Sequence, residues 1–455
     1  MRDIRLALSI ATRYLLRKSG GNRRRTISAI AGIALSMVPL ILVMELADGM
    51  IRGITSRYVE TGTYHLQAYP SGDLSPAEFR ARAQELREIP GVQNSVVEHR
   101  GVGLLSAPGG KSGVQLRSLS PTVLEKDRGF RKYLRIDDGS FDIEGDEDIV
   151  LGRYLAEELE VGPGDEVRLL TVRSLEGRSF LPRVSTFVVR GVVSTGYQEL
   201  DRLWAFVSLK RGLAVLPPEN ADTFIGIKID NPYALEQTLF GSPLPSLEDL
   251  RATRSAEKTV GAVTDSLGFN WRAYSWYNLE RSRYVSFQTS RNLLLFIMAL
   301  IVVVAAVNVS STLVMLVVEK EQEIAFLRTL GATPALIERI FLAAGALIGA
   351  LGVGVGAVLG VALAVNVNEL LLGLEQAINS AAIAGRAIFA PDSAGAAERI
   401  LLFSQEFYLE EVPITIDPLE LGTLVAVGML LALLAAIVPA RRSVQVYPLE
   451  LLRRH

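Results

Sequence analysis

Apolar residues are concentrated in a few long segments of this chain. Four apolar runs have the length of a membrane-spanning helix: residues 27–44, 293–318, 341–367 and 421–438. Such a helix needs about 20 residues to cross a hydrocarbon core of roughly 30 Å. Between the first and second runs lies a long stretch, residues 45–292, with the mixed pattern of a folded domain. The pattern predicts a membrane α-helical protein with four transmembrane helices and a large extracytoplasmic α/β domain inserted between the first and the second.

Charge near the first run predicts its orientation. Residues 1–25 contain eight basic residues and one acid, Asp3, and basic flanks stay preferentially in the cytoplasm. Counting crossings from there places the large insert outside and both termini inside, and the arginines of the tail agree: Arg441, Arg442, Arg453 and Arg454. A cleaved signal peptide is the alternative for the first run. Its apolar core exceeds the usual length of about 7 to 15 residues and no A-x-A-like site follows, so we expect an uncleaved anchor.

The spans divide the chain into nine segments. They are a cytoplasmic amphipathic segment (1–25), the first span (26–47), the external domain (48–285), a stalk with the second span (286–318), a cytoplasmic connection (319–339), the third span (340–367), an external loop (368–418), the fourth span (419–438) and a cytoplasmic tail (439–455). Within the external domain we expect an α/β subdomain from 50–115 and 216–285, and a β-rich subdomain from 116–215.

Local patterns place several elements in these subdomains. Residues 75–88 predict a helix with Ser75 as N-cap and Pro76 at the first helical position. Helical periodicity also marks 260–267. Alternation predicts strands at 63–68, 92–105, 166–172, 184–193, 203–207, 223–229 and 270–275. The connection at 171–183 is expected to be a long hairpin loop with exposed apolar residues, either a contact surface or a loop folded back on its own domain.

The cytoplasmic connection carries the most specific local signals. A helix is expected to end at Gly331, and Thr333 to cap a second helix that starts with Pro334 and continues into the third span. This predicts a short helical elbow. Inside the third span, glycines at four-residue spacing predict close packing against another helix, of this chain or of a second copy.

Composition excludes several classes of site. The net charge of −2 gives no reason to expect a nucleic-acid partner, and the absence of cysteine rules out disulfides. The "GGKSG" segment lacks the first glycine of a phosphate-binding loop, because Leu105 stands there. Neither the acidic run at 137–148 nor the three scattered histidines has the spacing of a metal site. We therefore expect a non-catalytic chain without a metal or cofactor of its own.

Three sequence segments carry a resemblance to a known family. They are "EKEQEIAFLRTLGATPALIERIF" at 319–341, "IVLGRYLAEELEVGPGDEVRLL" at 149–170 and "VPARRSVQVYPLELLR" at 438–453. They resemble permeases of the MacB, FtsX and LolC/LolE type of ABC transporter. The resemblance extends over nearly the whole chain, and within the family it is strongest to the lipoprotein-releasing LolC/LolE subunits.

That resemblance implies a location and a set of partners. We expect a multi-pass protein of the bacterial inner membrane, with a periplasmic domain and cytoplasmic termini. It would work with two copies of a separate ATPase, which holds ATP and magnesium, and with a second permease, identical or LolC/LolE-like. Acylated lipoproteins would be taken from the outer leaflet of the inner membrane, through mechanical coupling between the two sides, and passed to a periplasmic carrier.

The resemblance also assigns roles to residues of this chain. ATPase coupling falls on the elbow: Glu323, Phe326, Leu327, Arg328, Gly331, Ala332, Thr333, Pro334 and Ile337. The carrier-binding hairpin, called the Hook in LolC-like members, falls on Arg173, Arg178, Phe180, Leu181, Pro182 and Arg183. Lipid tails would meet Met37, Leu40 and Val43 of the first span and Phe296, Leu300 and Val304 of the second. We group Asn308 with this cavity, although ordinary interhelical hydrogen bonding is favoured over a ligand role for a polar residue in a span.

Two features depart from the LolC pattern. The hairpin is basic but lacks a clear identity match, and the loop 368–418 is longer than expected. Two alternative functions stay open: an FtsX-like signalling scaffold for a cell-wall hydrolase and a MacB-like efflux permease. FtsX-like chains usually have a much smaller external domain, and MacB resembles a fusion with its own ATPase.

Overall fold

The computed structural model describes residues 2–16, 20–175, 179–236, 247–389, 409 and 412–443. The chain forms two compact units. We call the first the helical unit (Met1–Gly49, Gln288–Ser380 and Ile414–His455) and the second the α/β unit (Met50–Phe287 and Ala381–Pro413). Among the described residues, four helical segments are long and apolar enough to cross a membrane: Thr26–Thr63, Arg281–Glu319, Pro334–Val365 and Pro418–Ser443.

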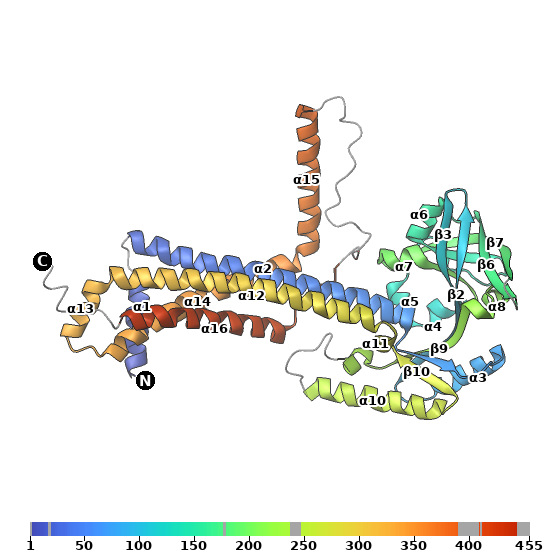
Figure 1. Cartoon of the computed structure of the whole chain (residues 1–455), viewed down its shortest axis with the longest axis horizontal. Helices are drawn as coiled ribbons and strands as arrows, with labels where there is room; N and C mark the ends of the chain where they lie inside the picture. The colour runs from blue at the N-terminus through green and yellow to red at the C-terminus, as the bar shows by residue number, and fades with distance from the viewer. Residues whose placement is uncertain are drawn as a thin grey trace. The chain divides into compact units, whose positions relative to one another are not determined.

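Long helices make up most of the helical unit (Figure 1). The helices are α1 (Arg2–Leu16), α2 (Gly20–Tyr58), α12 (Arg281–Glu319), α13 (Glu321–Thr329), α14 (Pro334–Val365), α15 (Val367–Phe389) and α16 (Pro418–Ser443). Helices α2 and α12 have 39 residues each, and each contributes residues to both units. At about 1.5 Å per residue they measure roughly 58 Å, so both extend well beyond the apolar runs that predicted them. Pro39 lies inside α2 and has no N–H to donate to the carbonyl of Leu35.

Glycines of α14 bring two helices close to its backbone. A Cβ atom at Gly345 or Gly349 would lie 2.3 or 2.6 Å from the Cβ of Ala436 or Ala432 in α16. Cβ atoms at Gly352, Gly356 and Gly360 would lie 2.6, 2.6 and 3.0 Å from the Cβ atoms of Ile33, Met37 and Ile41 in α2. The close packing predicted from the glycine spacing is thus confirmed, and its partners are α16 and α2 of the same chain.

A ten-stranded sheet organises the α/β unit. Its strands are β1 (Leu66–Pro70), β2 (Val92–Ala107), β3 (Gly110–Leu119), β4 (Arg135–Gly139), β5 (Asp148–Gly152), β6 (Glu166–Leu175), β7 (Ser179–Ser194), β8 (Trp204–Ser208), β9 (Ala221–Ile229) and β10 (Trp271–Ser275). The order is β10-β1-β9-β2-β3-β8-β5-β7-β4, and β6 pairs with β2 and β7.

This sheet joins the two subdomains that the sequence predicted separately. The 16-residue β2 pairs with β9 along its first part and with β6 near its end, and β3 continues into the middle region through its parallel partner β8. Its apolar clusters follow the same pattern. One gathers Leu151 and Phe187 of the middle region, another gathers Leu66, Phe79 and Val263 of the flanking segments, and a third, with Tyr64, Phe206 and Phe224, contains residues of both.

Helices of 4 to 21 residues cover this sheet and connect its strands. They are α3 (Pro76–Arg87), α4 (Val123–Lys126), α5 (Arg128–Tyr133), α6 (Arg153–Leu159), α7 (Gln198–Leu203), α8 (Leu209–Val215), α10 (Leu247–Leu267) and α11 (Trp276–Leu279). The predicted start of α3 is confirmed. The Ser75 side chain accepts a hydrogen bond from the backbone N–H of Glu78, the Glu78 carboxylate accepts one from the backbone N–H of Ser75, and Pro76 is the first helical residue. Helix α10 begins much earlier than the segment predicted at 260–267.

The region expected as the external loop 368–418 is largely helical in its first half. Helix α15 occupies Val367–Phe389, directly after the single turn residue that follows α14. Leu409 forms a β-bridge with Tyr197 of the α/β unit. Residues 390–408 lie outside the described part of the chain.

Candidate functional site

The elbow is built by a glycine turn between two helices. Helix α13 ends at Thr329, and Gly331 follows with φ of +93°, a backbone conformation that favours glycine. The N–H of Gly331 donates to the carbonyl of Arg328 and that of Ala332 to the carbonyl of Leu327, both at 3.0 Å. These two bonds form a Schellman motif, which ends α13 and turns the chain.

The start of the next helix is fixed just as locally. The side chain of Thr333 accepts a hydrogen bond from the backbone N–H of Leu336, and Pro334 is the first residue of α14. The N-cap and the first-turn proline predicted from the sequence are therefore confirmed. The elbow, residues 320–334, is thus a defined turn.

Side chains of α13 divide between the core of the helical unit and solvent. Ile324 and Ala325 are buried, and so is Ile337 in the first turn of α14. Phe326 and Leu330, one turn apart, are 64% and 69% exposed. Of the other predicted coupling residues, Gly331, Thr333 and Pro334 are exposed, whereas Glu323, Leu327, Arg328 and Ala332 are partly buried. The elbow thus exposes an apolar pair, Phe326 and Leu330, while Ile337 packs in the core of the helical unit.

Helix α1 braces the elbow through a tyrosine. Lys320 pairs with Glu323 at 2.7 Å, and its ammonium group lies 5.2 Å from the ring centroid of Tyr14. Burial, with Glu323 nearby, raises the pKa of Tyr14 to about 12. The Tyr14 ring also contacts Phe341 of α14, at 6.4 Å between centroids. These contacts hold α1, α13 and α14 together at the elbow.

The other end of α2 is tied into the α/β unit by buried charges. A π-helical turn, Val59–Thr63, extends α2. Within it Glu60 contacts Lys228 of β9 at 3.1 Å and His65 at 3.2 Å. Lys228 also pairs with Asp127, and both of their side chains are almost fully buried. Removing Lys228 would leave Asp127 buried without its cation.

A second buried cluster holds the same turn from the centre of the sheet. Arg117 is fully buried and contacts both carboxylate oxygens of Glu98 at 2.8 Å. Its third nitrogen donates to the carbonyl of Thr61 at 2.5 Å, and Arg100 donates to the carbonyl of Gly62 at 2.6 Å. Burial acts to raise the pKa of Glu98, but Arg100 and Arg117 outweigh it and lower that pKa to about 2. Charged groups of β2 and β3 therefore stabilise the end of α2.

The first turns of α12 are anchored in the same unit. Trp276 and Tyr284 are fully buried and meet edge to face at 4.9 Å between ring centroids. Arg283 donates to Glu199 at 2.9 Å and to the hydroxyl of Tyr58 at 3.1 Å. Both long helices therefore end in bonded sites within the α/β unit.

The predicted hairpin loop at 171–183 is shorter in the structure than expected. Backbone pairing of β6 with β7 continues from Glu166 and Val188 to Leu175 and Ser179, so most of that segment is strand. Pro182 and Arg183 are exposed, and Arg183 donates to the carbonyl of Ala214 at 2.6 Å. Arg178 and the side chains of Arg173, Phe180 and Leu181 lie outside the described residues.

The predicted lipid-facing residues fall into two groups. Met37 is fully buried against α14 and α16 and Leu40 is buried, while Val43 is partly exposed. On α12, by contrast, Phe296, Leu300 and Val304 are 64%, 51% and 61% exposed at four-residue spacing, and Asn308 is exposed one turn further on. Met37 therefore presents no surface to a lipid here, and α12 supplies the continuous apolar face.

An ionic cluster within the helical unit was not predicted. Arg291 of α12 lies 2.6 Å from Asp48 of α2 and also contacts Glu420 of α16. The contact at its Nε is an ion pair without hydrogen-bond geometry. One arginine thus links three helices near the boundary of their apolar segments. In the described part of the chain, no group of three histidine or acidic residues could hold a metal ion.

Comparison with known proteins places this geometry in a family. A model of the MacB-like periplasmic core domain matches residues 26–239, and a model of the FtsX-like permease C-terminal region matches residues 295–448. The chain is an ABC transporter permease of the MacB/FtsX type. The first match holds most of the α/β unit, and the second holds α13, α14 and α16. A permease of this family implies a partner ATPase and a paired permease.

Two curated relatives of this MacB/FtsX-type permease extend over almost its whole length. The lipoprotein-releasing system transmembrane protein LolC of Neisseria meningitidis is 27% identical over 450 residues, covering 98% of each chain. The corresponding LolE of Haemophilus influenzae is 24% identical over 426 residues, covering 93% of each chain. Among solved structures, the periplasmic region of MacB from Actinobacillus actinomycetemcomitans is 12% identical, with a TM-score of 0.28, over 48% of this chain and 91% of that one.

Proposed function

We propose that this permease is a subunit of an ATP-driven complex that extracts acylated lipoproteins from the outer leaflet of the inner membrane and passes them to a periplasmic carrier. The observation that carries the proposal is the match to LolC and LolE over 98% and 93% of this chain, both named as lipoprotein-releasing proteins. The match includes the α/β unit, the elbow and all four membrane-length helices.

The proposal includes an orientation. The α/β unit lies in the periplasm and both termini lie in the cytoplasm. The basic residues before the apolar segment of α2 support this orientation, because basic residues are retained on the cytoplasmic side. The family description of residues 26–239 as a periplasmic core domain supports it independently.

In this proposal the elbow binds a separate ATPase. Phe326 and Leu330 are exposed apolar residues on one face of a well-defined turn, and such residues bury favourably against a partner. Two copies of the ATPase would hold ATP and magnesium, and the second permease would be identical or LolC/LolE-like. The chain itself contributes no catalytic group.

Energy from the ATPase would reach the α/β unit through α2 and α12. Both helices are unbroken over 39 residues, and buried charges and aromatic rings fix their ends in the α/β unit. A movement of α2 and α12 that starts at the elbow would therefore move the α/β unit as well, because the helix ends cannot shift relative to that unit. The apolar face of α12, with Phe296, Leu300 and Val304, would contact the acyl chains of the cargo.

The test uses the full complex with its ATPase in lipid vesicles that contain a lipoprotein. The variant Leu330→Asp places a charge on the exposed elbow surface, and we expect loss of the ATPase from the purified complex and loss of lipoprotein release to the carrier. Leu250→Asp on α10 is the matched control, because Leu250 is 44% exposed and outside the elbow.

Two results would contradict different parts of the proposal. Normal ATPase binding and release by Leu330→Asp would refute docking at the elbow. An assembled wild-type complex that hydrolyses ATP but releases no lipoprotein would refute the transport function. Activation of a cell-wall hydrolase by that complex would then indicate an FtsX-like scaffold, and export of peptides or drugs a MacB-like pump.

A further inference from the structure

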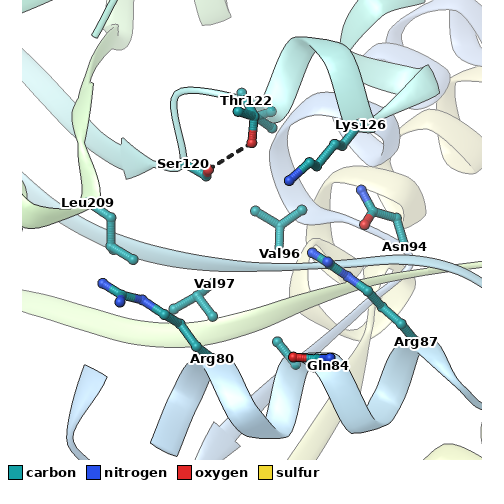
Figure 2. Close-up of a pocket in the computed structure, with 12 residues that line it drawn as sticks. Arg80, Gln84, Arg87, Asn94, Val96, Val97, Ser120, Thr122, Lys126 and Leu209 are labelled. Atoms are coloured by element: carbon teal, nitrogen blue, oxygen red, sulfur yellow. Dashed lines mark hydrogen bonds between the residues drawn. The ribbon is translucent and has the colours of Figure 1, made fainter. Parts of the chain in front are cut away.

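A basic pocket lies in the α/β unit, away from the hairpin and the ends of the long helices. It has a volume of about 250 Å³ and lies between α3, β2, the turn before α4, α4 itself and the start of α8. Figure 2 shows Arg80, Gln84 and Arg87 reaching into it from α3, with Lys126 on the opposite side. Nothing in the family matches assigns a role to it.

Among the described residues, three cations and no carboxylate line this pocket. The Arg87 side chain is held by the backbone of β2, because its Nε donates a hydrogen bond to the carbonyl of Ser95 at 3.1 Å. Arg80 and Lys126 are exposed, and neither side chain has an ion pair or hydrogen bond to any described residue. By comparison, the exposed Arg190 of the same unit pairs with Asp148. The pocket therefore concentrates positive charge that the fold leaves uncompensated.

The rest of the pocket lining consists of apolar side chains and of two side chains with hydroxyl groups. Val96 and Val97 of β2 and Leu209 of α8 form the apolar part. Ser120 and Thr122 lie beside it and hydrogen-bond to each other at 3.0 Å (Figure 2). A ligand that fits this surface carries negative charges together with an apolar or neutral polar portion.

The spacing of the cations distinguishes between kinds of anion. Arg80 and Arg87 are two turns apart on α3, which corresponds to about 10 Å along the helix axis. A single phosphate is much smaller than this separation. In an extended peptide, which rises about 3.3 Å per residue, carboxylates two to four residues apart are separated by roughly 7 to 13 Å.

We propose that this pocket binds an acidic, extended peptide segment of a partner protein, with its carboxylates at Arg80, Arg87 and Lys126 and an apolar side chain on Val96, Val97 and Leu209. Guanidinium groups bind carboxylates in a bidentate manner, which adds geometric selectivity. Since Arg80 and Lys126 are exposed, binding is expected to be modest and to weaken with salt. The site is independent of the cargo that the permease carries.

The experiment measures binding to the full chain in detergent by fluorescence anisotropy. The probe is a short fluorescein-labelled peptide of alternating glutamate and valine, and the same peptide with glutamine in place of glutamate is the control ligand. The variants are Arg80→Gln and Lys126→Gln, both exposed, and the matched control variant is Lys258→Gln, an exposed cation on α10 of the same unit. Tryptophan fluorescence verifies that each variant is folded.

The expected result is binding of the glutamate peptide alone, weakened about fivefold by Arg80→Gln and by Lys126→Gln, since a charge-assisted hydrogen bond at an exposed site contributes on the order of a fivefold change in affinity. Lys258→Gln should leave the affinity unchanged. Absence of peptide binding, or equal affinity in all three variants, overturns the proposal. Displacement of the peptide by an equal concentration of inorganic phosphate also overturns it, because the pocket would then be a small-anion site.

Discussion

Arg117 offers the sharpest test of how the end of α2 is held. The variant Arg117→Met keeps an unbranched apolar side chain in the same space and removes the guanidinium group. It eliminates both contacts to Glu98 and the hydrogen bond to the carbonyl of Thr61. It also removes the cation that lies 4.3 Å from the ring of Trp204.

The expected magnitude follows from burial. Glu98 and Arg117 both have fully buried side chains, and removing one partner of a buried pair costs about 3 to 5 kcal/mol. Arg100 still contacts Glu98 at 2.8 Å, and Tyr64 still donates to it at 2.7 Å. We therefore expect a loss near the lower end, about 3 kcal/mol in the free energy of unfolding of the α/β unit.

The assay is urea unfolding of the full chain in detergent, followed by tryptophan fluorescence. The chain has three tryptophans, Trp204, Trp271 and Trp276, and all of them belong to the α/β unit, so the signal reports that unit alone. Lys210→Met is the matched control, because its pair with Asp146 has exposed fractions of 79% and 56%, and such a pair contributes below about 1 kcal/mol.

Two outcomes would refute the reasoning. If Arg117→Met and Lys210→Met lowered stability equally, burial would not be the reason that the pair matters. The double variant Glu98→Gln with Arg117→Met should be less destabilised than the two single variants added together, because both changes disrupt the same buried pair. Fully additive losses would show that Glu98 stabilises the fold independently of Arg117.

Three further predictions concern other parts of the molecule. Because the pKa of Glu98 is held at about 2, below its ordinary 4.5, its stabilisation is complete above about pH 4.5 and is lost as the pH falls toward 2, a change on the order of 3 kcal/mol. Fluorescence-monitored unfolding across that range should show this loss, and the loss should be smaller in Glu98→Gln, in which Glu60, whose pKa is also lowered to about 2, still titrates. Gly352→Ala should lower the thermal unfolding temperature in detergent, since its Cβ would lie 2.6 Å from Ile33 and overpacking costs about 1 to 3 kcal/mol. Gly354→Ala, with nothing within 4 Å, should not lower it, and equal effects would contradict the packing argument. Phe180→Glu in the hairpin should weaken pull-down of a periplasmic carrier without affecting ATPase binding, whereas Val102→Glu, at a 62% exposed position of β2, should not; carrier capture that is unchanged in Phe180→Glu would refute the Hook assignment.

Features set by neighbouring residues were predictable from the sequence. The caps at Ser75 and Thr333 depend on a few adjacent residues, and both are present as expected. The apolar runs located the spans but underestimated their helices. In α2, for example, Glu45, Asp48 and Arg52 continue the helix beyond the apolar run, because polar residues at helical spacing can remain helical outside the hydrocarbon core.

Features set by distant pairing were not predictable. The parallel pairing of β3 with β8 joins segments far apart in sequence, and alternation within each strand carries no information about its partner. Nothing in the local sequence around Arg117, Glu98 and Lys228 indicates that the fold buries these charges. The same limit explains why the hairpin was predicted too long as a loop: the pairing of residues 171–175 with 179–183 is a property of two strands together.

Pro39, in the interior of α2, affects how this helix can bend, because the far end of the helix is held by buried charges. A helix that is fixed at one end bends most easily where an intrahelical hydrogen bond is missing. In α2 this is at Pro39, which has no N–H to donate to the carbonyl of Leu35. Flexure of this helix is therefore concentrated at a single pivot, inside the apolar segment and not at its junction with the sheet. The stiffness of α2 then depends on Pro39 and not on the contacts that fix its end in the α/β unit.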